Sequence, residues 1–409
     1  MTSRVALAVI AVAAIAATAA SAAEPAGLDA APADAWPLAR GCLAGTGRSS
    51  AELRLPLAEA WRRDFEKTAF GAVPVIAADT VFVGDLDGTF HALALDTGAT
   101  RWSFKAEAAG FPAAAAASLD PAVPVVVVGD DTGVVRALDR ATGEVRWEHE
   151  TGGEISGGPT ILPRPDGARV LVGSQDASLT CLDLAGGTVR WTFTIADQIR
   201  CAPTVVRTEA GDRVLIAGCD GRLHVVDAET GAETAAVPID GPTGTTPAAA
   251  GPLALFGTEG GIFFAIDVAA PAVAWRAQAA AGGQSYRSSA AVADGLAIVG
   301  SRGRAVEAFA VADGARAWRR PMRGRVDASP VVVMARGGGP DAAAAPRPVA
   351  IVADAAGRIA ALDARTGEPA WEFEAGGGFG GGAAVASGRV VLASDDGRVW
   401  CFRSGDNAR

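Results

Sequence analysis

The stretch Gly133-Val-Val-Arg-Ala-Leu-Asp-Arg-Ala-Thr-Gly-Glu-Val-Arg-Trp147 holds a strand, a turn and the start of a second strand. Val134 to Leu138 is mostly apolar and rich in β-branched side chains, as a buried strand requires. Ala141-Thr-Gly143 supplies a glycine that can adopt positive φ in the turn. Glu144 to Trp147 begins the next strand. The stretch therefore predicts a β-hairpin whose second strand carries a tryptophan.

The same pattern recurs along the chain. Its tryptophan position is filled by Trp61, Trp102, Trp147, Trp191, Trp275, Trp318 and Trp371, with Ala235 in one copy. Successive positions are 40 to 53 residues apart. A period of this size made of short strands is typical of a β-propeller blade, a four-stranded sheet that is stable only between neighbours. The eight positions predict an all-β, eight-bladed propeller in which these tryptophans dock one blade on the next.

The two ends of the chain are expected to share one blade. Trp61 has no three strands of its own before it, whereas residues 389–393 and 398–402 supply strands that no tryptophan follows. Pairing of the N- and C-terminal strands would close the ring and remove a free sheet edge. The insertion Arg336–Pro348, rich in Gly, Ala and Pro, explains the longest interval and predicts a surface loop.

The N-terminus has the parts of a secretory signal peptide. Arg4 precedes an apolar run from Val5 to Ala20, and small residues follow it. We expect a signal peptide at 1–23, an extended lead-in at 24–55, the propeller at 56–403 and a tail at 404–409. Export to the periplasm or out of the cell follows, although the leader could remain as an anchor, and no other stretch could cross a bilayer. Cys42 follows Arg and Gly far beyond the apolar run, which is no convincing lipid-attachment site.

Composition limits the classes of partner. Half of the residues are hydrophobic and the net charge is −10. Phosphate neutralisation needs an excess of basic residues on one face, so we expect no nucleic-acid partner.

The repeated word Asp-Gly, apolar residues, Ala-Leu-Asp, Thr-Gly and Trp resembles the repeat of the pyrroloquinoline-quinone (PQQ)-like β-propeller family over roughly 61–403. Trp36-Pro37 with Arg40-Gly41 resembles a lead-in of exported bacterial members. The family includes quinoprotein alcohol dehydrogenases, which bind PQQ with calcium, and non-enzymatic envelope members such as BamB. Fold alone does not choose between them.

The resemblance to the dehydrogenases fails in particulars. Those enzymes carry two adjacent cysteines at the cofactor, whereas the five cysteines here have no cysteine neighbour. No matching calcium ligands or catalytic aspartate are found, so we expect neither PQQ nor a metal, and no catalytic residue. His91 and His224 share a repeat position that holds many residue types in the other copies, which argues against a metal cluster.

Cys201 and Cys219 lie symmetrically about Ala210-Gly211 in one expected hairpin. They would face each other across antiparallel strands, so an exported chain could join them by a disulfide.

One ring of positions is expected at a mouth of the central channel, just before each inner strand. Most copies are small, but a charged sector stands out: Gly71, Gly110, Ser156, Arg200, Gly244, Arg287, Asp327 and Gly380. Tyr286 and Gln198 lie beside the arginines in sequence. The sector predicts a pocket that grips an anionic ligand or an acidic loop of a partner. The alternative is that Arg and Asp pair with each other around a water-filled channel.

These observations favour an exported, non-enzymatic binding or scaffold protein of the cell envelope with a protein partner, and a small ligand is also compatible. Two alternatives remain: a PQQ-dependent quinoprotein oxidoreductase and an envelope carbohydrate or polymer binder. For the latter, only Trp36 and Trp400 stand outside the repeated tryptophan position.

Overall fold

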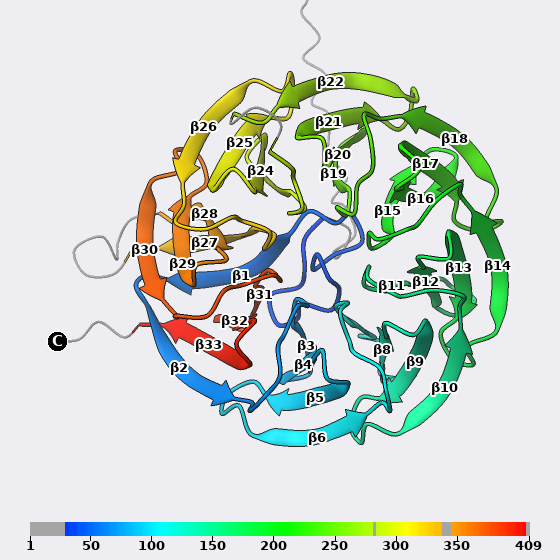
Figure 1. The fold of residues 1–409 in the computed structure, drawn as a ribbon, viewed down its shortest axis with the longest axis horizontal. Coiled ribbons are helices and arrows are strands. Elements are labelled where there is room, and N and C mark those ends of the chain that lie inside the picture. Colours follow the sequence, from blue (N-terminus) through cyan, green and yellow to red (C-terminus); the bar gives the residue numbers. More distant parts are fainter. Residues whose placement is uncertain (1–28, 281–283, 338–344, 406–409) are drawn as a thin grey trace, which may run out of the picture.

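The computed structural model describes residues 29–280, 284–337 and 345–405. The expected signal peptide and part of the expected surface loop lie outside these ranges. The described residues form strands and turns without a helix, and eight small sheets surround one axis (Figure 1). The predicted all-β, eight-bladed propeller is confirmed. Among the described residues, no helix has the length and apolar character needed to cross a membrane.

Six blades each take four consecutive strands, ordered from the channel outward. Their bounds are β3 (Val75–Ala77), β4 (Thr80–Gly84), β5 (Thr89–Ala94) and β6 (Thr100–Lys105); β7 (Ala116–Ala117), β8 (Val125–Gly129), β9 (Val134–Asp139) and β10 (Val145–Glu150); β11 (Thr160–Leu162), β12 (Arg169–Gly173), β13 (Ser178–Asp183) and β14 (Val189–Thr194); β15 (Thr204–Thr208), β16 (Gly211–Ala217), β17 (Arg222–Asp227) and β18 (Glu233–Pro238); β19 (Ala248–Ala250), β20 (Leu253–Gly257), β21 (Ile262–Asp267) and β22 (Ala272–Gln278); β23 (Ala291–Ala293), β24 (Leu296–Ser301), β25 (Ala305–Ala310) and β26 (Arg316–Pro321).

The last two blades include strands from the N-terminus. The eighth consists of β31 (Ala384–Ala386), β32 (Arg389–Ala393) and β33 (Arg398–Ser404), with β2 (Leu57–Asp64) as its outer strand. Trp61 lies opposite Cys401 in this antiparallel pairing. The two ends of the chain therefore close the ring, as the missing strands around Trp61 predict.

The seventh blade has a strand that we did not expect. It contains β27 (Val331–Arg336), β28 (Arg347–Ala353), β29 (Arg358–Asp363) and β30 (Pro369–Glu374). β1 (Arg48–Arg54) adds to its inner edge, parallel to β27. Side chains of β1 alternate between buried and exposed, with Ser49, Ala51 and Leu53 inward. Alternation of this kind is typical of a strand, so the sequence of this segment already contained a signal for β1 that we did not use.

Adjacent blades meet through the repeated tryptophans. Trp102 donates its indole N–H to the Arg140 carbonyl of the next blade at 3.1 Å, and Trp147 donates likewise to Leu184 at 2.8 Å. The turn glycine of the next blade lies against the ring: a Cβ at Gly143 would be 2.5 Å from Trp102. The Ala-Thr-Gly turn therefore provides a flat site on which the indole of the preceding blade packs.

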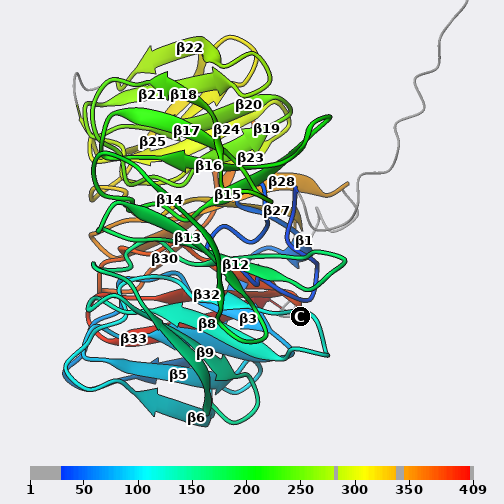
Figure 2. The same ribbon diagram turned by 90° about the vertical axis from the view of Figure 1, so that its right-hand side faces the viewer.

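The N-terminal segment occupies the middle of the ring (Figure 1), and in side view it lies at one end of the propeller (Figure 2). Its carbonyls accept hydrogen bonds from the inner strands of successive blades, for example from Ile76, Val205 and Val292 at 2.8–2.9 Å. The lead-in is thus an ordered closure of one channel end. We call this end the lead-in end and the opposite end the mouth.

Candidate functional site

The mouth is formed where the chain approaches each inner strand. The N–H of Phe111 bonds the Asp85 carbonyl just as that of Ile155 bonds Asp130 and that of Tyr286 bonds Thr258. Phe111 is therefore the equivalent of Ile155 and Tyr286. The ring position of the second blade is consequently Pro112, and the expected Gly110 was wrong by two residues.

Tyr286 does not line the mouth, which corrects the sequence prediction. Its side chain is fully buried between two blades, where its hydroxyl donates to Glu307 at 2.7 Å. A Cβ at Gly257 would lie 2.3 Å from the Tyr286 Cβ, so the preceding blade provides space for the ring. Burial, followed by the nearby Glu307 carboxylate, raises the pKa of Tyr286 far above its usual value. The tyrosine is a core residue.

Arg200 and Arg287 lie on the exposed rim of the mouth. Two guanidinium N–H groups of Arg200 donate to the Gln198 side-chain oxygen at 2.8 and 2.5 Å. Arg287 lies 3.5 Å from Glu259. Elsewhere on the rim, Ser156 accepts a hydrogen bond from Gln175 at 3.0 Å. Gln198 thus positions Arg200 without neutralising it.

Asp327 contacts arginines other than Arg200 and Arg287, which the sequence placed in the same sector. Arg302 grips both of its carboxylate oxygens at 3.0 Å, and Arg325 contacts one at 2.9 Å. Arg200 and Arg287 are therefore not its partners among the described ion pairs. Four arginines and two carboxylates form the ion pairs of this sector, and the carboxylates of Asp197 and Asp220 act on Cys219 together with Arg200. The arginines of the mouth therefore stand among several carboxylates.

Below the mouth, a belt of hydroxyl groups links neighbouring blades inside the channel. The N–H groups of Ala202, Thr246 and Ser289 donate to the hydroxyls of Thr246, Ser289 and Ser329, at 2.9–3.1 Å. Arg40 of the lead-in lies next to this belt, with one nitrogen 2.9 Å from the Ala290 carbonyl and 2.8 Å from that of Pro330.

Arg40 is only 4% exposed, and its Nε and Nη1 have no partner among the described atoms. Burial lowers the pKa of its guanidinium to about 10. In the sequence, Arg40 stands out only as part of the lead-in motif, because a single residue outside the repeats has no equivalent copies with which to compare it.

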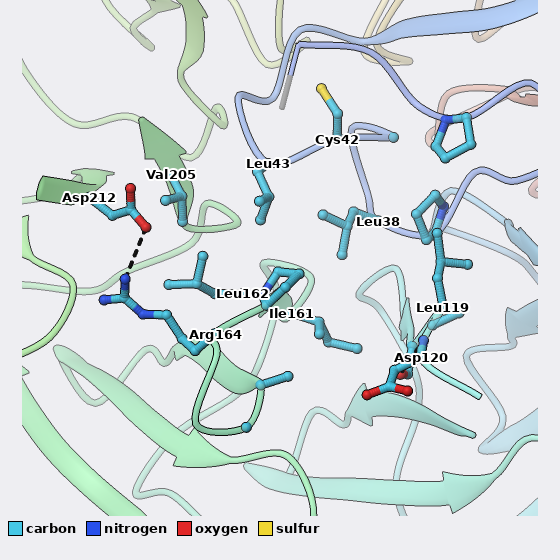
Figure 3. Close-up of a pocket in the computed structure, with 18 of the residues that line it drawn as sticks. Leu38, Cys42, Leu43, Leu119, Asp120, Ile161, Leu162, Arg164, Val205 and Asp212 are labelled. Carbon is cyan, nitrogen blue, oxygen red and sulfur yellow. Dashed lines mark hydrogen bonds and ion pairs between the residues drawn. The ribbon is translucent and has the colours of Figure 1, made fainter. Parts of the chain in front are cut away.

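A cavity of about 510 Å³ opens at the lead-in end (Figure 3). Its walls are mainly Leu38 and Leu43 of the lead-in, Ile161 and Leu162 of β11, and Val205 of β15. Arg164 and Asp212 form an ion pair of 3.0 Å on one side, and Leu119 and Asp120 lie on the other. No repeat pattern marks these residues, because the cavity depends on where the lead-in leaves the sheet edges.

The predicted disulfide is absent: Cys201 and Cys219 are both free. The β15–β16 hairpin pairs Thr204 with Leu215 and Thr208 with Gly211, which extrapolates Cys201 opposite Gly218. A register shift of one residue sends a side chain to the other face of a strand. Cys201 is accordingly buried, whereas Cys219 is partly exposed.

His91 and His224 each contact carboxylates of their own blade. His91 contacts Asp85 at 2.9 Å, and His224 contacts Asp220 at 2.9 Å and Glu233 at 2.7 Å. The described residues contain no group of three or more His, Cys, Asp or Glu that could hold a metal ion. Trp36 and Trp400 are both buried, at 0% and 3% exposure, and offer no stacking surface for a sugar.

Comparison with known proteins places the geometry in a family. The family model described as outer membrane protein assembly factor BamB matches residues 58–153, 131–210, 205–331 and 302–408. The chain belongs to this BamB-like family. Together the matches span nearly all of the ring, including both strands that close it. None of the curated proteins compared with the chain matches it.

Solved structures share the fold at low identity. BamB from Moraxella catarrhalis is 20% identical with a TM-score of 0.67, covering 86% of this chain and 99% of its own. Quinohemoprotein alcohol dehydrogenase from Comamonas testosteroni is 15% identical with a TM-score of 0.70, covering 92% and 81%. A europium-containing methanol dehydrogenase is 12% identical with a TM-score of 0.66, covering 90% and 98%. These similarities extend to the propeller fold and no further.

Proposed function

We propose that this BamB-like propeller is an exported, non-enzymatic scaffold of the cell envelope that binds an acidic segment of a protein partner at its mouth. The observation that carries the proposal is the cluster of four arginines at the mouth, in which Arg200 donates to an uncharged amide and Arg287 makes only a long contact with Glu259. Arginine forks bind carboxylates in a directed manner, and burial at an interface strengthens such contacts.

Arg200 and Arg287 differ from the two arginines that hold Asp327. Arg302 and Arg325 are occupied by that carboxylate. Arg200 is oriented by an uncharged amide, and the contact of Arg287 with Glu259 is long for a charge-assisted hydrogen bond. Arg200 and Arg287 therefore keep most of their capacity for an incoming carboxylate.

The envelope location rests on two supports. The matching family model is named for an outer membrane assembly factor, and the N-terminal sequence has the pattern of a secretory leader. Fractionation of cells that express the full chain tests this part directly. Recovery in the cytoplasm with residues 1–23 retained would contradict it.

Capture of partners from envelope extracts tests the mouth. The mature protein should retain a partner that the Arg200→Ala/Arg287→Ala variant loses. A matched control is Arg62→Ala/Arg276→Ala, which removes the same charge from exposed positions on the outer strands β2 and β22. Equal retention by all three proteins would remove the mouth from the proposal.

A quinoprotein oxidoreductase is the second candidate, because a dehydrogenase is among the similar folds. The residues do not fit the family's cofactor site: no two cysteines are adjacent, and the lead-in with Arg40 occupies the channel. We therefore expect no PQQ cofactor. Titration with PQQ and calcium should leave the absorption and tryptophan fluorescence spectra equal to the sum of the separate components, and saturable binding would reverse this expectation.

A further inference from the structure

We propose that the cavity at the lead-in end is a second binding site, which takes an extended, mainly apolar peptide segment of a partner protein. The segment would hydrogen-bond to the inner strand β11. The site is formed by different residues from those of the mouth, and the inference does not rest on the proposed function.

The lead-in itself demonstrates this type of contact on the other blades. Six inner strands donate an N–H to a lead-in carbonyl, each from the second residue of the strand, and a Pro or Ala directly precedes each of these strands. The donors are Ile76, Ala117, Val205, Ala249, Val292 and Val332, at 2.8–2.9 Å. In the eighth blade, Ser49 of β1 donates its hydroxyl to the Val385 carbonyl at 2.9 Å. The inner edge of a blade in this molecule is thus a site for extended backbone.

Among the described residues, the inner strand of blade three has neither kind of contact with the lead-in. Its equivalent residue is Ile161, which lies opposite Val170 in the β11–β12 pairing as Val205 lies opposite Val214. The Val205 N–H points away from its own sheet, toward Leu43. The Ile161 N–H therefore points the same way, and no described lead-in residue accepts it.

The lead-in leaves this edge uncovered because it turns. Pro37 accepts from Ala117 of the second blade, and the next such contact is that of Leu43 with Val205 of the fourth. Between them, the Gly41 N–H bonds the Leu38 carbonyl at 2.8 Å and closes a tight turn. The turn carries the chain past the third blade without pairing and leaves the cavity between Leu38, Leu43 and Ile161.

The size, the apolar walls and the strand edge of the cavity favour an extended apolar peptide. Its volume of about 510 Å³ is that of a ligand pocket, and its walls are mostly aliphatic and proline side chains. An unpaired backbone N–H at an apolar strand edge is the pattern that binds an added strand: main-chain hydrogen bonds give affinity and alternate side chains enter pockets. A small apolar molecule would leave the Ile161 N–H without an acceptor.

The rim adds two features. Leu119 is 47% exposed beside the cavity, so a bound segment can cover it. The Asp120 carboxylate accepts the Ala122 N–H and forms no described ion pair, so it is available to a basic residue that flanks the apolar segment. Arg164 is instead held by Asp212 and Glu229.

The test uses a synthetic probe, the acetylated and amidated peptide KTVLVTK, and the full mature protein. Fluorescence anisotropy of the labelled peptide should give saturable binding, and amide hydrogen exchange of the segment containing Ile161 should slow when the peptide is present. Methylation of the peptide's central backbone nitrogens should weaken binding about tenfold, because it removes main-chain donors without changing the side chains.

Protein variants locate the site. Leu119→Ser should weaken peptide binding about fivefold. Ile161→Pro should weaken it at least as much, because it removes the inward N–H and also replaces the isoleucine side chain that lines the cavity. Leu86→Ser is the matched control, because Leu86 has 46% exposure and lies outside the cavity. Arg200→Ala/Arg287→Ala should also leave peptide affinity unchanged, which separates this inference from the proposal for the mouth.

Three outcomes would overturn the inference. One is no saturable binding of the peptide, and another is equal loss of affinity in Leu119→Ser and Leu86→Ser. The third is strong protection of the Ile161 segment in the mature protein without peptide, since the chain's own N-terminal residues would then fill the edge.

Discussion

The two ends of the central channel are built from different interactions. At the lead-in end, backbone N–H groups of successive inner strands donate to lead-in carbonyls, and Arg40 contacts the Ala290 and Pro330 carbonyls. At the mouth, the interactions are made by charged side chains. The carboxylates of Asp85 and Asp130 accept backbone N–H groups in the turns between the second and third strands, and arginines contact Asp327. The lead-in end is held mainly by backbone hydrogen bonds with one buried guanidinium, that of Arg40, and the mouth is held by ionised side chains.

This difference separates stability from recognition. Backbone contacts to many blades tie the ring together whatever the side chains are, whereas the exposed arginines of the mouth can change without disturbing the sheets. The exception at the lead-in end is blade three, where the closure is interrupted and a cavity appears. Variants that remove charge at either end therefore test the comparison.

The largest effect is expected at Arg40. Arg40→Ala should lower the free energy of unfolding by about 3 kcal/mol, because it empties a buried volume and leaves two carbonyls without a donor. Arg40→Met should cost about 1 kcal/mol, since it keeps the volume and removes a buried charge with two unpartnered nitrogens. Urea unfolding followed by tryptophan fluorescence measures both. Equal values for the two variants would show that the guanidinium contacts do not hold the lead-in.

A smaller, pH-dependent effect is expected at Asp130 near the mouth. Burial raises the pKa of this carboxyl, but hydrogen bonds from Thr132, Arg136 and the Val134 amide outweigh burial and lower the pKa below its ordinary value. The ionised carboxylate therefore stabilises the fold above pH of about 4, and this contribution is lost as the pH falls through the folded pKa.

Asp130→Asn should cost about 2 kcal/mol at pH 7 and much less at pH 2.5. Urea unfolding at the two pH values measures the change. Asp240→Asn is the control, because Asp240 is 63% exposed and its pair with Arg276 should contribute under about 0.5 kcal/mol. A cost for Asp130→Asn that does not depend on pH would mean that shape, not charge, holds the turn.

The arginines of the rim should matter least for stability. Arg200→Ala/Arg287→Ala should change the free energy of unfolding by less than about 0.5 kcal/mol, because both side chains are exposed. The same urea titration applies. A loss of several kcal/mol would make these residues part of the scaffold and would explain any loss of a partner without a binding site.

The free thiols give a kinetic test with no expected change in stability. Burial raises the pKa of Cys201 to about 12, and it also raises that of Cys219, which is partly exposed. Iodoacetamide at pH 8 should modify Cys219 slowly and Cys201 only after denaturation, as followed by peptide mass spectrometry. If denatured, unreduced protein left this pair unmodified, the two cysteines would be joined after all.

The sequence repeats predicted the ring well because every blade must pack against its neighbour in the same way. The Ala-Leu-Asp strand, the Thr-Gly turn and the tryptophan must recur wherever one sheet packs on the next, so the missing strands around Trp61 already indicated closure by β33. Tyr286 shows the limit of that approach. Rim residues and core residues are adjacent in each repeat, as Arg287 and Tyr286 are. Glycine occupies the Gly257 position in several blades, so it does not distinguish a tyrosine from the aliphatic residues found there.

The lead-in could not be predicted in the same way. Arg40, Leu38 and Leu43 occur once, so no internal comparison exists, and their positions depend on the path of the lead-in, which contacts a strand as far as 336 residues away. The disulfide prediction failed on a one-residue difference in hairpin register, which the turn alone did not determine.

The pairing of β2 with β33 also has a consequence for the order of events in folding. Trp61 and Cys401 face each other although 340 residues separate them, so β2 has no partner until the residues of β33 have been synthesised. The ring can close only after that point. Until then the chain is an open array of hairpins. In that state it can still pass through a narrow pore, which the closed ring cannot.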